Sequence, residues 1–82
     1  MKYVVDLNRI RLTREKLGIT KTEMASLLGL SGTEKYTRRE TGEYNFKATE
    51  IPVLSATLKL PMEKILVSAL RKSKNKMKEV KQ

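Results

Sequence analysis

The chain has 82 residues, 39% of them hydrophobic, so it is large enough for one domain and one small core. It contains no Cys and no His, which excludes disulfides, zinc sites with these ligands and histidine-based acid–base catalysis; no apolar run is long enough to cross a bilayer. Eighteen basic against nine acidic residues give a net charge of +9, which implies an anionic partner, most commonly nucleic acid.

The N-terminal segment predicts a short extended arm followed by a helix. Residues 1–5 have the β-propensity for an arm but are too few for an independent strand. Asp6 is a suitable N-cap, and Gly18 is suited to end a helix over residues 7–17. The apolar stripe of this helix includes Arg14, a charge that needs a partner if it is buried.

Two short helices follow. Thr20 and the glutamate three residues later form a capping box, which marks the start of a helix. Gly29 is suited to end that helix, and a second helix is predicted over residues 33–41, ending at Gly42. Two short helices joined by a tight turn that contains glycine form a helix-turn-helix, here residues 20–42.

The rest of the chain predicts two more helices and a basic tail. One helix begins near Ala48 or Thr49 and ends near residue 58, and Pro61 opens the next. This last helix carries more apolar residues than one small core can cover. It is either a symmetric dimer contact or a closing helix that packs only on its own domain. The candidate dimer contacts are Met62, Leu66, Val67 and Leu70. Residues 71–82 contribute +5, as a solubilising end or as an arm that binds phosphates.

Three stretches together resemble the lambda-repressor/Cro-like (XRE) family of DNA-binding regulators. They are RxxxGIT at residues 14–20, MAxLLGLS at 24–31 and YTRRETGEYNF at 36–46. The resemblance covers about residues 7–66. It implies a compact all-α, five-helix domain over residues 1–70 with a short N-terminal arm, followed by the basic tail. The chain departs from the family by one extra residue in the turn.

The resemblance also implies structural roles for four side chains. Arg14 matches an arginine that pairs with a glutamate late in the second helix of the motif, and Glu40 occupies that glutamate's position. Tyr36 occupies an apolar core position, and Phe46 resembles an anchor that ties the following loop to the core. We therefore expect Arg14 and Glu40 to form a structural ion pair.

The outward residues at the start of the second helix of such a motif contact base edges in the major groove. Arginine suits guanine O6 and N7, lysine a guanine or a phosphate, glutamate cytosine N4, and threonine a thymine methyl or a phosphate. The candidate base contacts are Thr33, Glu34, Lys35, Thr37 and Arg38.

Phosphate contacts are expected from the first turn of the preceding helix, from the end of the second helix and from the loop after it, including backbone amides of that loop. The candidates are Lys21, Arg39, Thr41, Tyr44, Asn45 and Lys47. A solvated surface role is the alternative for Lys21 and Tyr44, and Arg39 can face either surface.

These observations predict a regulator that binds specific sequences of double-stranded DNA, and the resemblance adds a repressor of phage or mobile-element type. We expect a cytoplasmic, nucleoid-associated protein that is a homodimer at least on DNA, with no membrane partner, cofactor, metal or small-molecule ligand. The alternative is a helix-turn-helix protein-interaction module, an antitoxin or adaptor, that uses its last helix. RNA binding is a third option, disfavoured because few aromatic residues are available to stack bases. An enzyme is not expected, since the carboxylates are scattered and no nucleophile–base pair is evident.

Overall fold

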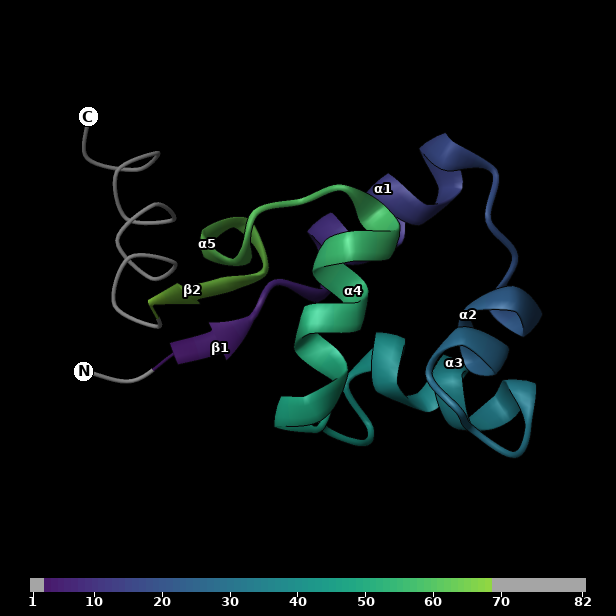
Figure 1. Cartoon of the computed structure of the whole chain (residues 1–82). Helices are drawn as coiled ribbons and strands as arrows, with labels where there is room; N and C mark the ends of the chain where they lie inside the picture. The colour runs from purple at the N-terminus through teal and green to yellow at the C-terminus, as the bar shows by residue number, and fades with distance from the viewer. Residues whose placement is uncertain (1–2, 69–82) are drawn as a thin grey trace, which may run out of the picture.

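The structure, a computed structural model, describes residues 3–68, and side chains of residues 4–67. The described residues form a small, mostly helical domain (Figure 1). Its elements are β1 (Tyr3–Val5), α1 (Leu7–Leu17), α2 (Lys21–Leu27), α3 (Thr33–Thr41), the 3-10 helix η1 (Ala48–Glu50), α4 (Ile51–Leu58), α5 (Met62–Ile65) and β2 (Leu66–Ser68). Helices α2 and α3 lie at one end, the two strands lie at the other, and α1 and α4 lie between them.

The predicted ends of the first two helices are confirmed. The Asp6 side chain accepts a hydrogen bond from the Arg9 amide at 3.1 Å, which caps α1. Gly18 ends α1 in the left-handed conformation, with φ of 74°. Thr20 and Glu23 form the predicted capping box at the start of α2. These ends were predictable because each depends on residues within one helical turn.

The connection between α2 and α3 comprises residues 28–32, and it is tightened by a backbone hydrogen bond from the Leu30 amide to the Ala25 carbonyl at 2.8 Å. Gly29 has φ of 73°, which a residue without Cβ adopts at little cost. Gly32 occupies the N-cap position of α3, and because glycine has no side chain, this helix start is not capped by a side-chain hydrogen bond. The predicted range of α3, with Gly42 at its end, is confirmed.

The prediction of a long fifth helix is wrong. Helix α5 ends at Ile65, and the next three residues form β2, which pairs antiparallel with β1. Val4 lies opposite Val67 and Val5 opposite Leu66, and the Asp6 amide extends the pairing to the Ile65 carbonyl at 2.7 Å. The N-terminal arm therefore becomes a strand, because a partner strand about sixty residues later in the chain satisfies its backbone groups.

This strand also divides the candidate dimer surface. Successive side chains of a strand point to opposite faces. Val67 is buried at 8% exposure, so it is not available as the surface contact that was predicted, whereas Leu66 is partly buried against the core. Met62 is exposed. Leu70 and the tail of residues 71–82 lie outside the described residues.

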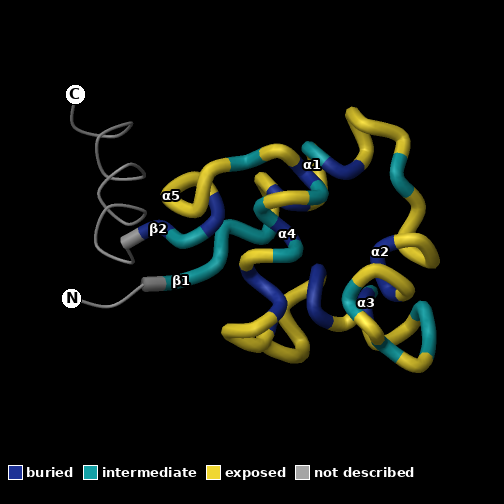
Figure 2. The backbone as a smooth tube through the Cα atoms, viewed as in Figure 1, coloured by how far each residue is buried: buried dark blue, intermediate teal, exposed yellow. Residues whose placement is uncertain are grey.

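The core draws buried side chains from all five α-helices and from the segment between α3 and η1, and the buried stretches appear dark blue in Figure 2. Most of its side chains are aliphatic, and Tyr36 packs edge-on against Phe46 with ring centroids 6.1 Å apart. Leu17 and Leu27, at the ends of α1 and α2, are large apolar side chains that lie exposed outside the core. The fully buried side chains are Ile10, Met24, Tyr36, Leu54, Leu58 and Ile65. Among residues 3–68, no helix has the length and apolar character needed to span a membrane.

A buried polar network connects α1 to α3. Arg14 Nε donates to Glu40 Oε2 at 2.8 Å, and Arg14 Nη2 donates to Glu40 Oε1 at 3.2 Å, so the predicted ion pair is confirmed and is bidentate. The Tyr36 hydroxyl donates to the same carboxylate at 2.6 Å, and Arg14 Nη1 donates to the Ile19 carbonyl at 2.9 Å. In the described residues, no buried side-chain nitrogen or oxygen lacks a hydrogen-bond partner.

The network changes the acid–base behaviour of its members. The hydrogen bond to Glu40 raises the pKa of Arg14 above its usual value, which outweighs the opposing effect of burial. The pKa of Tyr36 is raised well above its usual value of 10.0, first because burial disfavours the tyrosinate and second because the hydroxyl donates to Glu40. Arg14 and Tyr36 therefore keep their protons throughout the neutral range.

Removal of the shared carboxylate should destabilise the fold. Glu40→Ala leaves the Arg14 guanidinium buried without its anion and the Tyr36 hydroxyl without its acceptor. We expect a loss of about 3–5 kcal/mol in the free energy of unfolding, measured by urea denaturation. The matched control is Glu63→Ala, which removes an exposed carboxylate that belongs to none of the described ion pairs and should cost at most about 0.5 kcal/mol. Equal losses in the two variants would contradict a structural role for the network.

The raised pKa of Tyr36 predicts a loss of stability at high pH. An acid whose pKa is higher in the folded state stabilises that state fully below the unfolded pKa, here 10.0, and less as the pH rises above it. We expect the urea midpoint of the wild type to fall between pH 9 and 11 (about 10 being the unfolded pKa) more steeply than that of Tyr36→Phe. The comparison cancels the lysine titrations common to both proteins. Parallel curves would contradict the assignment.

Candidate nucleic-acid interface

Helix α3 has one buried face and one exposed face. Tyr36, Arg39 and Glu40 are buried, and they fall on one side of the helix at about 100° per residue. The opposite side is exposed and presents polar or charged residues at consecutive positions around the helix: Glu34, Lys35, Arg38 and Thr41. The part of α3 that faces solvent can therefore donate and accept hydrogen bonds.

Arg39 is not a phosphate contact in this structure, which corrects the prediction. Its side chain is buried, and Nε donates to Glu50 Oε1 at 2.9 Å. Nη1 donates to the Lys35 carbonyl at 3.3 Å. The reason is tertiary: η1 places a buried carboxylate beside the arginine, and each of these two charges satisfies the other. Adjacent residues, Arg39 and Glu40, thus tie α3 to η1 and to α1.

Arg38, one position earlier, lies on the exposed face and folds back onto the loop after α3. Its guanidinium carbon lies 5.6 Å from the centroid of the Tyr44 ring, and Nη1 donates to the Tyr44 hydroxyl at 3.2 Å. Glu43 Oε1 is 3.9 Å from Arg38 Nε. Arg38 therefore contacts a candidate phosphate residue and an acidic neighbour. Glu34, a candidate base contact, forms none of the described ion pairs.

The other candidate base contacts are placed differently. Lys35 and Glu34 are exposed, and the Glu34 carboxylate folds back over Gly32 at the start of α3. The two threonines lie at the edge of the exposed face and are half-buried. The Thr33 hydroxyl is 2.9 Å from the Thr22 hydroxyl of α2, and the Thr37 hydroxyl donates to the Thr33 carbonyl at 3.1 Å. Their hydroxyl groups thus already have partners within the protein.

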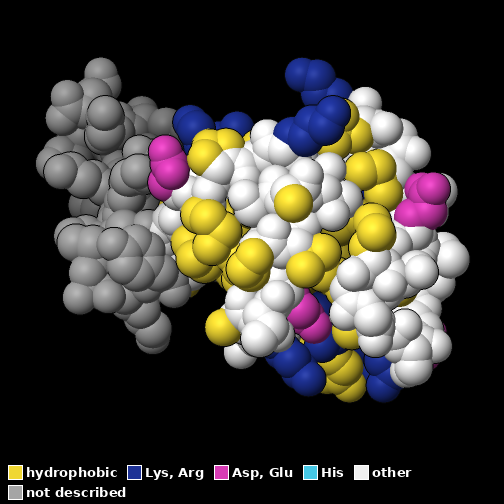
Figure 3. Space-filling model, viewed as in Figure 1, with side chains coloured by type: hydrophobic (Ala, Val, Ile, Leu, Met, Phe, Trp, Pro, Cys, Tyr) yellow, Lys and Arg dark blue, Asp and Glu magenta, His cyan; other side chains and the backbone are white. Residues whose placement is uncertain are grey.

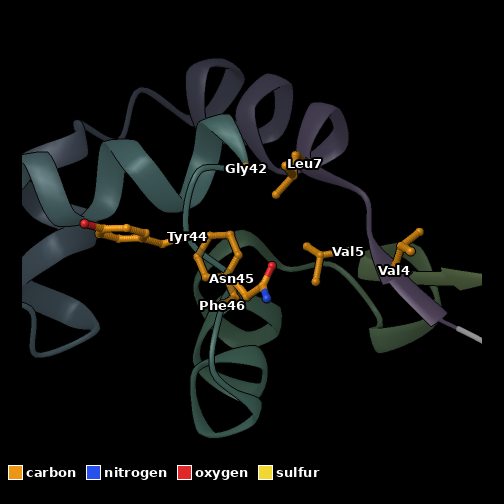
Figure 4. A pocket seen from close by; sticks show the side chains of 7 residues that line it. All are labelled: Val4, Val5, Leu7, Gly42, Tyr44, Asn45 and Phe46. Carbon is orange, nitrogen blue, oxygen red and sulfur yellow. The ribbon is translucent and has the colours of Figure 1, made fainter.

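The loop of residues 42–46 returns along α3 and forms one wall of a groove whose other wall is β1 and the start of α1 (Figure 4). The Tyr44 amide donates to the Arg38 carbonyl at 3.1 Å, and the Gly42 amide donates to the Arg39 carbonyl at 3.2 Å. The predicted use of the loop amides for phosphate is therefore wrong at these two positions. Figure 4 shows the Tyr44 ring extending away from Val5.

The remaining phosphate candidates have exposed side chains. Lys21 lies in the first turn of α2, Thr41 at the end of α3, Asn45 in the loop and Lys47 just before η1. The Thr41 hydroxyl donates to the Arg38 carbonyl at 3.1 Å, and the Lys47 amide donates to Glu50, so the backbone of this segment is held in place. In Figure 3, Lys and Arg side chains lie along the lower edge of the described part of the molecule, where α3 and the segment before α4 lie, and also along its upper edge.

The described domain carries much less charge than the whole chain. Eleven basic and eight acidic residues lie within residues 3–68, so more than half of the net +9 lies outside this range. Two of the eleven, Arg14 and Arg39, are buried in ion pairs. Their partners Glu40 and Glu50 are buried as well, so burial leaves the small net positive charge of this surface unchanged.

Two acidic residues of this region were not predicted from the sequence. Glu50 is the buried partner of Arg39, and Glu43 accompanies Arg38 and Tyr44. The sequence does contain an indication of the contact between Glu43 and Arg38. Gly42 reverses the chain after α3, so residues on either side of it come together. No comparable local signal indicates Glu50, which lies eleven residues from its partner in another element.

A scan against protein-family models finds no match for this chain, and a search of curated proteins finds none either.

The neighbouring arginines provide a matched pair of variants. Arg39→Ala leaves the Glu50 carboxylate buried and unpaired and should lower the free energy of unfolding by about 3–5 kcal/mol. Arg38→Ala removes an exposed side chain whose ion pair spans 3.9 Å, and it should change stability by at most about 1 kcal/mol. Thermal and urea denaturation of both variants measure the difference. A larger loss in the Arg38 variant would contradict these assignments.

Proposed function

We propose that this protein is a transcriptional regulator of the lambda-repressor/Cro-like type, a repressor that binds specific sequences of double-stranded DNA. The observation that carries the proposal is the division of α3 into a buried face and an exposed face that can hydrogen-bond. Helices α2 and α3 pack together and are joined by residues 28–32, which supports assigning them to a helix-turn-helix, a motif whose second helix lies in the major groove. The motifs from residue 14 to residue 46 support the same type of protein.

In the proposed mechanism, α3 enters the major groove with its exposed face toward the bases. Arg38 donates two hydrogen bonds to guanine O6 and N7, and Lys35 reaches a second base or a phosphate. Lys21, Asn45 and Lys47 contact phosphates on either side, which fixes the position of the helix in the groove. The buried ion pairs hold α3 in place, so little conformational freedom is lost when DNA binds.

The described residues give less support to a protein-interaction module. That alternative relied on a continuous apolar face of the last helix. Leu66 and Val67 are instead in a strand and are at least partly buried, which leaves Met62 as the exposed member of the face within residues 3–68. An adaptor also has no need for an arginine and a lysine on the outward side of α3.

The test is selection of duplexes from a random DNA library with the full-length protein, followed by fluorescence anisotropy at several salt concentrations. We expect the selected duplex to bind at least about a thousandfold more tightly than a scrambled one. Arg38→Ala should lower affinity for the selected duplex by about 1–3 kcal/mol and reduce the preference.

Arg9→Ala is the control, because it removes the same charge from an exposed position on α1. It should preserve the ratio between the selected and scrambled duplexes. If every duplex binds alike and binding disappears as salt rises, the interaction is electrostatic only, and the proposed function is rejected.

A further inference from the structure

The contact between Arg38 and Tyr44 joins a residue proposed to read a base with a residue proposed to contact the DNA backbone. The guanidinium lies over the aromatic ring at 5.6 Å and donates to its hydroxyl oxygen at 3.2 Å. The loop backbone supports the arrangement, since the Tyr44 amide donates to the Arg38 carbonyl at 3.1 Å and Gly42, with φ of 93°, turns the chain back. Both side chains remain close to half exposed, so both can meet a ligand.

We propose that Tyr44 is a positioning and specificity-determining residue: it holds the Arg38 guanidinium for guanine while its hydroxyl donates to the neighbouring phosphate. This inference rests on the proposed function and deepens it. The ligand has two parts, a guanine edge and a phosphodiester oxygen. Tyr44 contributes to the binding of both, through Arg38 for the guanine and through its own hydroxyl for the phosphate.

The direction of the hydrogen bonds supports this coupling. A guanidinium can only donate, so the Tyr44 oxygen is the acceptor in its contact with Arg38. The hydroxyl hydrogen must then point to a different acceptor, and on a DNA surface the nearest acceptors outside the bases are phosphate oxygens. When the Tyr44 hydroxyl donates its hydrogen to a phosphate, its oxygen still accepts the hydrogen bond from Arg38. The two contacts can therefore form together.

The stacking also reduces the conformational cost of base recognition. A free arginine loses much of its rotamer freedom when it forms a bidentate contact. An aromatic ring beneath the guanidinium restricts that freedom before DNA arrives, and the attraction between cation and ring favours the same position. Glu43 Oε1, 3.9 Å from Arg38 Nε, offers the guanidinium a further acceptor.

The experiment measures discrimination at one base pair with the full-length protein. The test base pair is the guanine whose replacement by adenine weakens wild-type binding most. The ratio of affinities for the selected duplex and for the duplex with that replacement is determined for each variant. We expect about 10- to 100-fold in the wild type. Tyr44→Phe, which keeps the ring, should reduce the ratio by about two- to tenfold. Tyr44→Leu, which also removes the ring, should reduce it by about two- to fivefold more.

Asn45→Ala is the matched control, because it removes a neighbouring, exposed phosphate candidate from the same loop. It should weaken binding to both duplexes equally and leave the ratio unchanged. Thermal denaturation should show all three loop variants folded, since both side chains are exposed.

The possible results distinguish the proposed role of Tyr44 from the proposed DNA-binding function. If the wild type discriminates at guanine and Tyr44→Phe weakens both duplexes by the same factor, Tyr44 is an independent phosphate contact and the inference is overturned. If Arg38→Ala retains the guanine preference, another residue reads that base and the inference is equally overturned. If the wild type prefers no duplex, the proposed DNA-binding function fails, and this inference fails with it.

Discussion

The carboxylate of Glu40 is the group on which the placement of α3 depends. It accepts two hydrogen bonds from Arg14 and one from Tyr36, all in the interior, where an unmatched charge is costly. These bonds join the first helix to the end of α3 and leave little freedom for the helix to rotate. A second buried pair, between Arg39 and Glu50, ties the same end of α3 to the segment before α4. The two pairs together decide which face of α3 reaches solvent.

Three consecutive residues of α3 illustrate how strongly position around a helix determines role. Arg38, Arg39 and Glu40 are all charged, and each is turned by about 100° from the one before. Glu40 faces α1, Arg39 faces η1, and Arg38 faces solvent and the loop that carries Tyr44. Two of the three charges therefore serve the fold, and the third remains exposed, in contact with Tyr44 and Glu43. All three residues contribute to the net charge of the chain, although only the exposed Arg38 is accessible to a partner.

Several features were predictable because they depend on neighbours in the chain. The first helix and α3 were predicted with their observed bounds, since Asp6, Gly18 and Gly42 mark helix ends by side-chain capping or by a left-handed backbone. The Arg14–Glu40 pair was expected from the resemblance. The exposure of the residues between Thr33 and Gly42 followed in part from helical periodicity, although the burial of Arg39 did not.

The sequence by itself determined the helical class of the domain, the positions of its first helices and the chemistry available on α3, because capping and periodicity act within a few residues. Only the tertiary structure decided that residues 66–68 leave the last helix and pair with residues 3–5, since strand pairing is settled by a distant partner. It also decided that Arg39 is buried and that Arg38 stacks on Tyr44. A buried ion pair or a stacked arginine needs two elements brought together, and no local pattern encodes where that partner will be.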